Sequence, residues 1–549
     1  MSQPPQTIRT PPDKPDASHV NGQPKLHGYS AQNSQPTFWT SWRWWLPAAV
    51  VSLILILIFV DPFIGDWDGL DYTILSLRGQ PSSMALGRSL FTLYNYLLYR
   101  AAHALFDVPP SQAYLVFKYA VVVQGPLAVV ACWALARDLT RSVQSATVAA
   151  MLLMFSPILI IYSGQVMTDV PAVLIISLSL LIHMRGLRQR KVMLVLIGAA
   201  LLGASVNLRE TTAFYAPWLV IAPFVFGWKL SRRELVIVGL SCLVFVLFAV
   251  SGFGYWFFSD PVYRASWQGW RESMRQESAT HPVSIRNVWP FLVYVFVTSP
   301  MVLVSLPFAF RKEWRERGWS PLLLLAGVGV AVDLMLLLNY STSIVWRYPF
   351  ASMPALAPLA GDYLHRTLNA RLRSSARALL VCGAVIILLV VLFGLYVRPI
   401  SKQFVAWRTL SKTYNSQLAR LPRDAVVMAG QQTVAINYWR GVGAGEWDVI
   451  GTGSGWPGPQ LVPLITNYLN NGRRVFIDAD TRWWFVCGWQ REEIPEVVKL
   501  ESQFHFRRVS DFIYEFRPPD DANASDSPNL KRLLPENRPE DVARCPLSR

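Results

Sequence analysis

Residues 235–257 read LVIVGLSCLVFVLFAVSGFGYWF, 23 consecutive residues without a charged side chain. At 1.5 Å per residue, a helix of this length crosses the roughly 30 Å hydrocarbon core of a bilayer. Ten further apolar runs occur along the chain, and the shorter ones can borrow flanking residues to span. The eleven predicted spans are Leu46–Val60, Ala113–Ala136, Val143–Ile161, Val170–Met184, Val192–Val206, Thr212–Phe226, Leu235–Phe257, Val288–Phe310, Pro321–Leu338, Tyr348–Leu364 and Leu379–Val397. The pattern predicts an all-α polytopic membrane protein.

The composition agrees with a membrane protein. Of 549 residues, 52% are hydrophobic and only 16% are charged, against roughly 25% charged in soluble domains. The net charge of +16 could suggest nucleic acid as a partner. In a polytopic membrane protein, however, an excess of Lys and Arg is first explained by their distribution between the loops on the two sides of the membrane. We expect the lipid bilayer as partner and no nucleic acid.

Basic residues alternate between the loops on the two sides of the predicted spans. With the N-terminus inside, the inner loops hold 17 Lys and Arg, and the much longer outer loops hold nine. Loops rich in Lys and Arg remain on the cytoplasmic side. The charges therefore predict eleven spans, with the N-terminus inside and the C-terminus outside.

The chain divides into four predicted parts. Residues 1–42 are polar and Pro-rich and predict a disordered cytoplasmic arm, residues 43–398 form the transmembrane domain, and residues 519–549 form a disordered tail. Residues 399–518 have the pattern of a small α/β domain outside the membrane. Its predicted strands are 425–430, 447–453, 473–480 and 511–518, and its predicted helices are 431–439 and 459–471.

Two basic, aromatic-rich segments on the outer side predict helices that lie in the membrane interface. Residues 87–106 mix Arg and His with Leu and Tyr, and residues 263–275 carry two Trp and three Arg. Such residues prefer the headgroup level. For residues 87–106 the alternative is a twelfth span, which would break the alternation of charge.

Carboxylates and arginines converge on the outer rim of the predicted bundle. A carboxylate can deprotonate an acceptor hydroxyl, and arginines can hold a phosphate through two hydrogen bonds. This combination suits the transfer of a group from a lipid phosphate. The residues concerned are Asp66, Asp68, Asp71, Asp169, Arg209, Glu210, Arg347 and Tyr348.

Four segments, in order, resemble motifs of the GT-C glycosyltransferases that use dolichyl- or polyprenyl-phosphate sugars. This branch includes protein O-mannosyltransferases, the lipid A aminoarabinose transferase and RgtA/B/C/D-like enzymes. DWDGLDY (66–72) resembles the first acidic motif through Asp68 and Tyr72, with Gly69 where Glu is usual. SGQVMTDVPA resembles the second through Asp169, and ASVNLRETTAFYAPWLV places Arg209 where a phosphate-binding Lys is usual. RYPFASMPALAPLAG (347–361) resembles the late RY-x-x-P-x-x-P-A segment.

The resemblance implies a GT-C-like fold and inverting transfer of a sugar from a polyprenyl phosphate. Asp68 would be the general base or orient the acceptor, with Asp66 as the second candidate, and Asp169 would position the acceptor or a cation. Arg209, Arg347 and Tyr348 would bind the donor phosphate. A divalent cation, Mg²⁺ or Mn²⁺, is left open because members of the class differ in this respect. The implied location is the plasma (inner) membrane, with the active site on the periplasmic side.

Structural roles remain alternatives for several of these residues. Asp66 and Asp68 could be solvated loop residues, Arg347 could anchor a helix end at the interface, and Glu210 could only pair with Arg209. A transporter or flippase of lipid-linked glycans is the competing function, although no internal repeat is visible. A glycan polymerase or ligase is a third, but in the sequence the acidic loop comes early. The sugar, and whether the acceptor is lipopolysaccharide, another envelope glycan or a protein, stay open.

Overall fold

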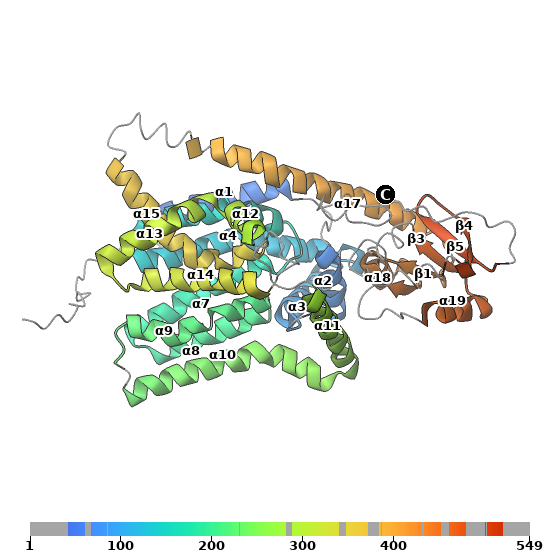
Figure 1. The fold of residues 1–549 in the computed structure, drawn as a ribbon, viewed down its shortest axis with the longest axis horizontal. Coiled ribbons are helices and arrows are strands. Elements are labelled where there is room, and N and C mark those ends of the chain that lie inside the picture. The colour runs from blue at the N-terminus through green and yellow to red at the C-terminus, as the bar shows by residue number, and fades with distance from the viewer. Residues whose placement is uncertain are drawn as a thin grey trace, which may run out of the picture.

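The computed structural model describes residues 42–60, 67–84, 86–229, 231–280, 288–339, 347–371, 384–385, 387–430, 433–451, 460–478, 500 and 502–519. A bundle of long helices occupies one end of the molecule, and a small mixed sheet occupies the other (Figure 1). Residues 1–41 of the predicted arm (1–42) and residues 520–549 of the predicted tail (519–549) lie outside the described residues.

The bundle and the elements around it are helical throughout the described residues. In chain order they are α1 (Trp42–Phe59), α2 (Trp67–Arg78), α3 (Ser89–Phe106), η2 (Pro110–Gln112), α4 (Ala113–Thr140), α5 (Val143–Met154), α6 (Pro157–Ser163), α7 (Asp169–Gln189), α8 (Val192–Val206), η3 (Glu210–Tyr215), α9 (Pro217–Val225), α10 (Arg232–Ser259), α11 (Pro261–Thr280), α12 (Val288–Thr298), α13 (Pro300–Arg317), α14 (Pro321–Asn339), η5 (Tyr348–Ser352) and α15 (Met353–Arg371).

Several of these helices have the length and hydropathy of membrane spans. Among the described residues, four helices qualify alone: Pro110–Thr140, Asp169–Gln189, Arg232–Ser259 and Pro321–Leu338. Two bent pairs qualify as broken spans, and α8 and most of α1 are shorter apolar helices. A multi-pass membrane protein is thus confirmed, whereas the count of eleven spans and the orientation stay predictions.

Proline explains why two predicted spans are broken. The segment expected as one span over Val143–Ile161 consists of α5 and α6, bent by 61°, and Val288–Phe310 falls in α12 and α13, bent by 101°. The second helix of each pair begins with Pro157 or Pro300 after an extended serine. Proline disfavours helical geometry in the preceding residue but is well suited to the first position of a helix.

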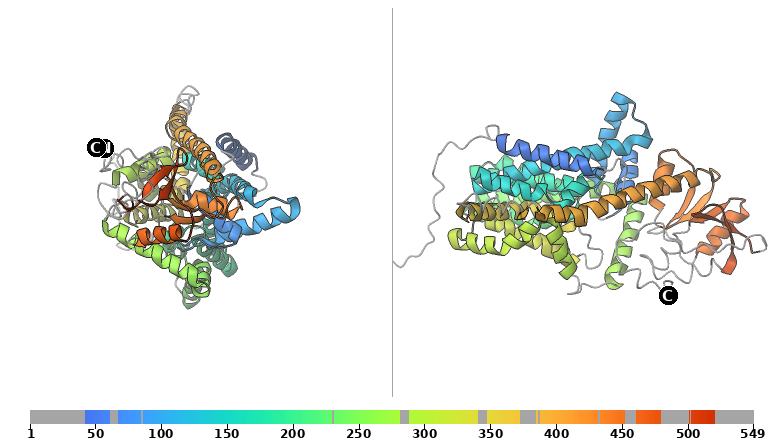
Figure 2. Two further views of the ribbon diagram at one scale, coloured as in Figure 1. Left: turned by 90° about the vertical axis from the view of Figure 1, so that its right-hand side faces the viewer. Right: turned by 90° about the horizontal axis from the view of Figure 1, so that it is seen from above.

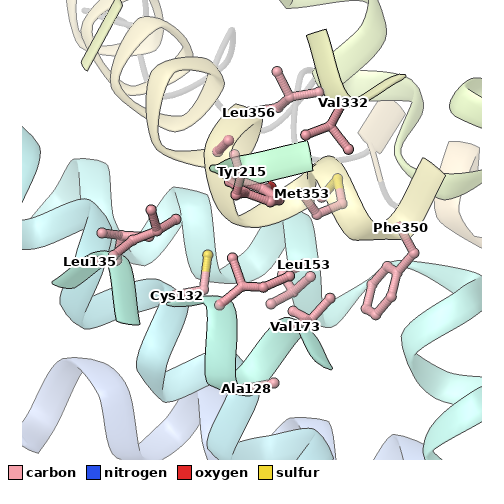
Figure 3. Close-up of a cluster of buried hydrophobic side chains, with 14 of the residues drawn as sticks. Ala128, Cys132, Leu135, Leu153, Val173, Tyr215, Val332, Phe350, Met353 and Leu356 are labelled. Atoms are coloured by element: carbon pink, nitrogen blue, oxygen red, sulfur yellow. The ribbon is translucent and has the colours of Figure 1, made fainter. Parts of the chain in front are cut away.

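The core of the bundle is closed by apolar side chains from helices far apart in the sequence. Figure 3 shows Cys132 of α4, Leu153 of α5 and Val173 of α7 meeting Tyr215 of η3 and Met353 of α15. The hydroxyl of Tyr215 donates a hydrogen bond to the carbonyl oxygen of Ala351, at 2.8 Å. These contacts bring η3 and η5, which both follow predicted site residues, against the same part of the core.

Two helices run crosswise to the long axis of the bundle. α3 projects from the bundle and α11 crosses its end near the sheet (Figure 2). α3 leaves large apolar side chains exposed, among them Leu97, Leu105 and Phe106, and it is not among the span candidates. Both helices coincide with the segments predicted to lie in the membrane interface, which stays a prediction.

The C-terminal domain is a five-stranded sheet in the order β2-β1-β3-β5-β4. Its elements are β1 (Val426–Ala429), α18 (Thr433–Gly441), β2 (Asp448–Gly451), α19 (Leu461–Asn470), β3 (Val475–Asp478), β4 (His505–Arg508) and β5 (Ile513–Arg517). β1 is parallel to β2 and β3, and β5 is antiparallel to β3 and β4. Strand β4 was not expected, because only Phe506 of its four residues is buried. The long helix α17 (Arg398–Leu418) connects the bundle to this sheet (Figure 1).

Candidate active site

The predicted residue Asp68 lies in the first turn of α2 and contacts Arg347, which directly precedes η5. Nη2 of Arg347 donates a hydrogen bond of 2.6 Å to Oδ2 of Asp68. The side chain of Arg347 is only 9% exposed. The two residues are 279 positions apart, so the fold unites the first and the last predicted motifs.

A second ion pair lies beside the first. Asp169 begins α7, and its Oδ1 is 2.7 Å from Nη1 of Arg209, with both side chains at most 3% exposed. Nε of Arg347 lies 3.9 Å from the other oxygen of Asp169. Asp68, Arg347, Asp169 and Arg209 therefore form a continuous row of alternating charge.

Aromatic rings flank the arginines of this row. The guanidinium of Arg209 lies over the ring of Tyr348, 5.1 Å from its centroid, and that of Arg347 lies over Tyr162 at 5.4 Å. Cation–π contacts hold a guanidinium in place while leaving its N–H groups free to point elsewhere. Tyr348 thus joins the cluster as predicted, and Tyr162 is an addition that the sequence did not indicate.

Glu210 has a partner other than the one the sequence suggested. We considered a pair with Arg209, but both oxygens of Glu210 accept hydrogen bonds of 3.4 Å from Arg88, while Arg209 faces Asp169. Arg88 also lies over the ring of Tyr72, 5.3 Å from its centroid. Arg88 was missed as a site residue because it was assigned to the interface helix; its position beside Gly87, before α3 begins, is the signal that could have revealed it.

Burial and neighbouring charges set the pKa values of three carboxyl groups outside the spans. Burial disfavours the Asp68 carboxylate, but Arg347 and Arg88 outweigh this effect and hold its pKa below the usual range. Burial and the adjacent Asp68 raise the pKa of Asp71 to about 7. Burial of Glu210 is outweighed by Arg88 and Arg209, which lower its pKa to about 2. Asp68 and Glu210 are therefore charged at neutral pH, and Asp71 titrates there.

Two points of the prediction are not addressed by these contacts. Asp66 lies outside the described residues. Among the residues that the structure describes, no group of three or more His, Cys, Asp or Glu side chains could hold a metal ion.

The carboxylate–arginine row lies at the end of the helical bundle that contacts the small α/β domain, and part of the bundle matches a known family in sequence. Residues 93–256, which include Asp169, Arg209 and Glu210, match the family described as dolichyl-phosphate-mannose-protein mannosyltransferase. No curated protein matches the chain by sequence. Residues 93–256 are therefore similar in sequence to a family of glycosyltransferases.

Two solved structures share the fold of this chain. ArnT from Cupriavidus metallidurans bound to undecaprenyl phosphate superposes with a TM-score of 0.59 at 15% identity, covering 88% of this chain and 99% of ArnT. The archaeal oligosaccharyltransferase AglB from Archaeoglobus fulgidus, in complex with an inhibitory peptide and a dolichol-phosphate, gives 0.51 at 13% identity, covering 88% of this chain and 75% of AglB. At these identities the likeness concerns the fold alone.

Proposed function

We propose that the enzyme transfers the sugar of a polyprenyl-phosphate donor to an acceptor hydroxyl or amine outside the cytoplasm, with inversion at the anomeric carbon. The observation that carries this proposal is the row Asp68–Arg347–Asp169–Arg209. It holds a charged carboxylate 2.6 Å from an arginine that is itself beside a second, buried ion pair. A base and a phosphate site are thus adjacent, as single-step transfer requires.

The reaction needs one bond to form and one to break. The acceptor oxygen or nitrogen attacks the anomeric carbon, while the bond between that carbon and the phosphate oxygen breaks. Asp68 receives or orients the acceptor proton, and the lipid phosphate leaves with the bonding electron pair. Because Asp68 is ionised at neutral pH, its carboxylate can accept a hydrogen bond from the acceptor hydroxyl or amine before the sugar is transferred.

The arginines act on the leaving group. Negative charge grows on the phosphate as the sugar departs, and fixed cations outside bulk water stabilise it. Arg347 can exchange its contact with Asp68 for a phosphate oxygen without losing its support from Tyr162. Asp169 keeps Arg209 oriented through their ion pair, and the ring of Tyr348 packs against the same guanidinium.

The experiment is transfer of radiolabelled sugar from a polyprenyl-phosphate pool to membrane acceptors. We expect Asp68→Asn to reduce transfer by about 100-fold or more, the usual range for loss of a general base. The matched control is Asp107→Asn, an exposed acid at the end of α3 with a 99% exposed side chain. The fraction that receives label, whether lipopolysaccharide, another envelope glycan or protein, identifies the acceptor.

Two results would count against this assignment. Transfer by Asp68→Asn at the wild-type rate would remove Asp68 as the base and move attention to Asp66 or Asp71. An α-linked product formed from an α-linked donor would show that the configuration at the anomeric carbon is retained. This result would exclude single-step inversion.

A further inference from the structure

The helix that carries Asp68 also forms the membrane-domain side of the contact with the C-terminal domain. Leu70 of α2 is buried in a cluster with Val434, Ala435 and Tyr438 of α18. In Figure 1, α18 lies directly beyond α2 at the end of the bundle. The C-terminal domain therefore touches the second residue after Asp68.

One glycine makes a close approach of the two helices possible. A β-carbon on Gly441, the last residue of α18, would overlap Cδ1 of Ile74. Leu70 and Ile74 are four residues apart, so they lie on the same face of α2. Both are nearly fully buried, at 4% exposure each. The face of α2 towards α18 is thus covered over about one helical turn.

The opposite side of α2 is held by α3. The ring of Tyr72 contacts Phe91 of α3 edge to face, with centroids 5.5 Å apart, and Arg88 lies over the same tyrosine. α2 has only 12 residues, and isolated helices of this length are marginal in water. Its position therefore depends on packing from both sides, and α18 supplies one of them.

We propose that α18 is a positioning element for Asp68, so that the C-terminal domain controls the chemical step by holding α2. The inference rests on the proposed role of α2 in transfer. Residues Leu70, Ile74 and Gly441 act through α2 and touch no substrate. Because a displacement of about 1 Å in a reacting group can cost about 100-fold in rate, a small shift of α2 is sufficient to reduce kcat. The donor phosphate site on Arg209 and Arg347 lies on other elements and is retained.

The test is a double-mutant cycle between the two helices in the full-length protein. Gly441→Val inserts a branched side chain against Ile74, and we expect kcat to fall by at least tenfold. The Kd for polyprenyl phosphate should stay within about twofold. Ile74→Ala removes the atoms that the new side chain meets, so the double variant should recover at least half of the lost kcat. Ala444→Val, at an exposed position three residues beyond Gly441, is the matched control and should retain kcat.

A second variant keeps the proposal testable when Gly441→Val fails to fold. Leu70→Ala weakens the same contact from the side of α2 and leaves the C-terminal domain unchanged, and it too should lower kcat at constant polyprenyl-phosphate Kd. Wild-type kcat in both variants, or no recovery with Ile74→Ala, would overturn the proposal. The proposal would also be overturned if the fraction of protein that binds polyprenyl phosphate fell together with kcat. That result would show that the contact only maintains the folded structure.

These outcomes separate the positioning role from the proposed function. When Asp68→Asn is fully active but the Gly441–Ile74 cycle still shows coupling in kcat, α18 positions a different group of α2, with Asp71 as the nearest carboxyl. When Asp68→Asn is inactive and the cycle shows no coupling, the chemistry stands and the role of α18 does not.

Discussion

Arg209 and Asp169 form a buried ion pair that stabilises the bundle and belongs to the proposed donor site. Each would be costly to bury alone, and together they neutralise one another at 2.7 Å. Removing one member of such a pair leaves an unpaired charge in a place that water does not reach. Their burial at the start of α7 therefore links the stability of the bundle to the residues of the proposed donor site.

Asp169→Asn should destabilise the protein by about 3 kcal/mol, since it leaves Arg209 buried without its counter-ion. Thermal unfolding in detergent is the measurement. Adding polyprenyl phosphate should recover part of the loss, because the ligand supplies a new anion to Arg209. Equal melting temperatures for the variant and the wild type would contradict the importance of this pair.

Asp71 should make stability depend on pH. Its pKa is raised to about 7 in the folded protein, against about 3.9 in an unfolded chain. The folded state therefore binds the proton more tightly, so this contribution is complete below about pH 4 and is lost as the pH rises through about 7. Between about pH 5 and about pH 8, the melting temperature of wild type should fall more than that of Asp71→Asn. The same slope for both, with Asp107→Asn as the control, would be the contrary result.

At the scale of elements, strand β5 concentrates charge inside the C-terminal sheet. Glu515 is 2% exposed and accepts hydrogen bonds from Arg474 of the β3 edge, Arg507 of β4 and Arg517 of its own strand, at 2.6, 2.5 and 2.9 Å. The arginine side chains are 28–48% exposed, so water screens them in part. The glutamate is the shared anchor of three strands.

Glu515→Gln should therefore loosen the C-terminal sheet by about 2 kcal/mol, a value below that of a fully buried pair because the arginines keep contact with water. Limited proteolysis should cut the C-terminal domain faster and leave the helical bundle intact. Asp511→Asn, on an acid with a 75% exposed side chain next to the same strand, should behave like wild type. Unchanged proteolysis in Glu515→Gln would refute the anchoring role.

At the scale of the whole molecule, the orientation predicted from charge decides which compartment supplies the acceptor. Val509 in the C-terminal domain and Trp319 between α13 and α14 are exposed at 42% and 69%. The predicted topology places Val509 outside the membrane and Trp319 on the cytoplasmic side. A single label can therefore distinguish the two sides.

In a background with Cys487→Ser and Cys545→Ser, we expect a membrane-impermeant maleimide to label Val509→Cys on intact cells. Trp319→Cys should react only after permeabilisation. The reverse pattern would place the active site on the cytoplasmic side and would invert the topology drawn from the loop charges.

The sequence by itself determined the local features. Apolar runs predicted the helices, alternating and continuous apolar segments predicted four of the five strands, and charged residues at the ends of those runs marked Asp68, Asp169, Arg209 and Arg347. These features follow from hydropathy, periodicity and backbone geometry within a few turns. The expected class of enzyme came from the resemblance of four segments, in order, to motifs of a known family.

Only the tertiary structure decided which charges meet. Nothing local pairs Glu210 with Arg88, 122 residues away, or Arg347 with Asp68, 279 residues away. Nor does local sequence bring Gly441 against Ile74, because these two residues are 367 positions apart in the chain. Long-range pairing depends on how spans, broken by Pro157 and Pro300, pack around a common core. That packing is a property of all the helices together, and no single segment encodes it.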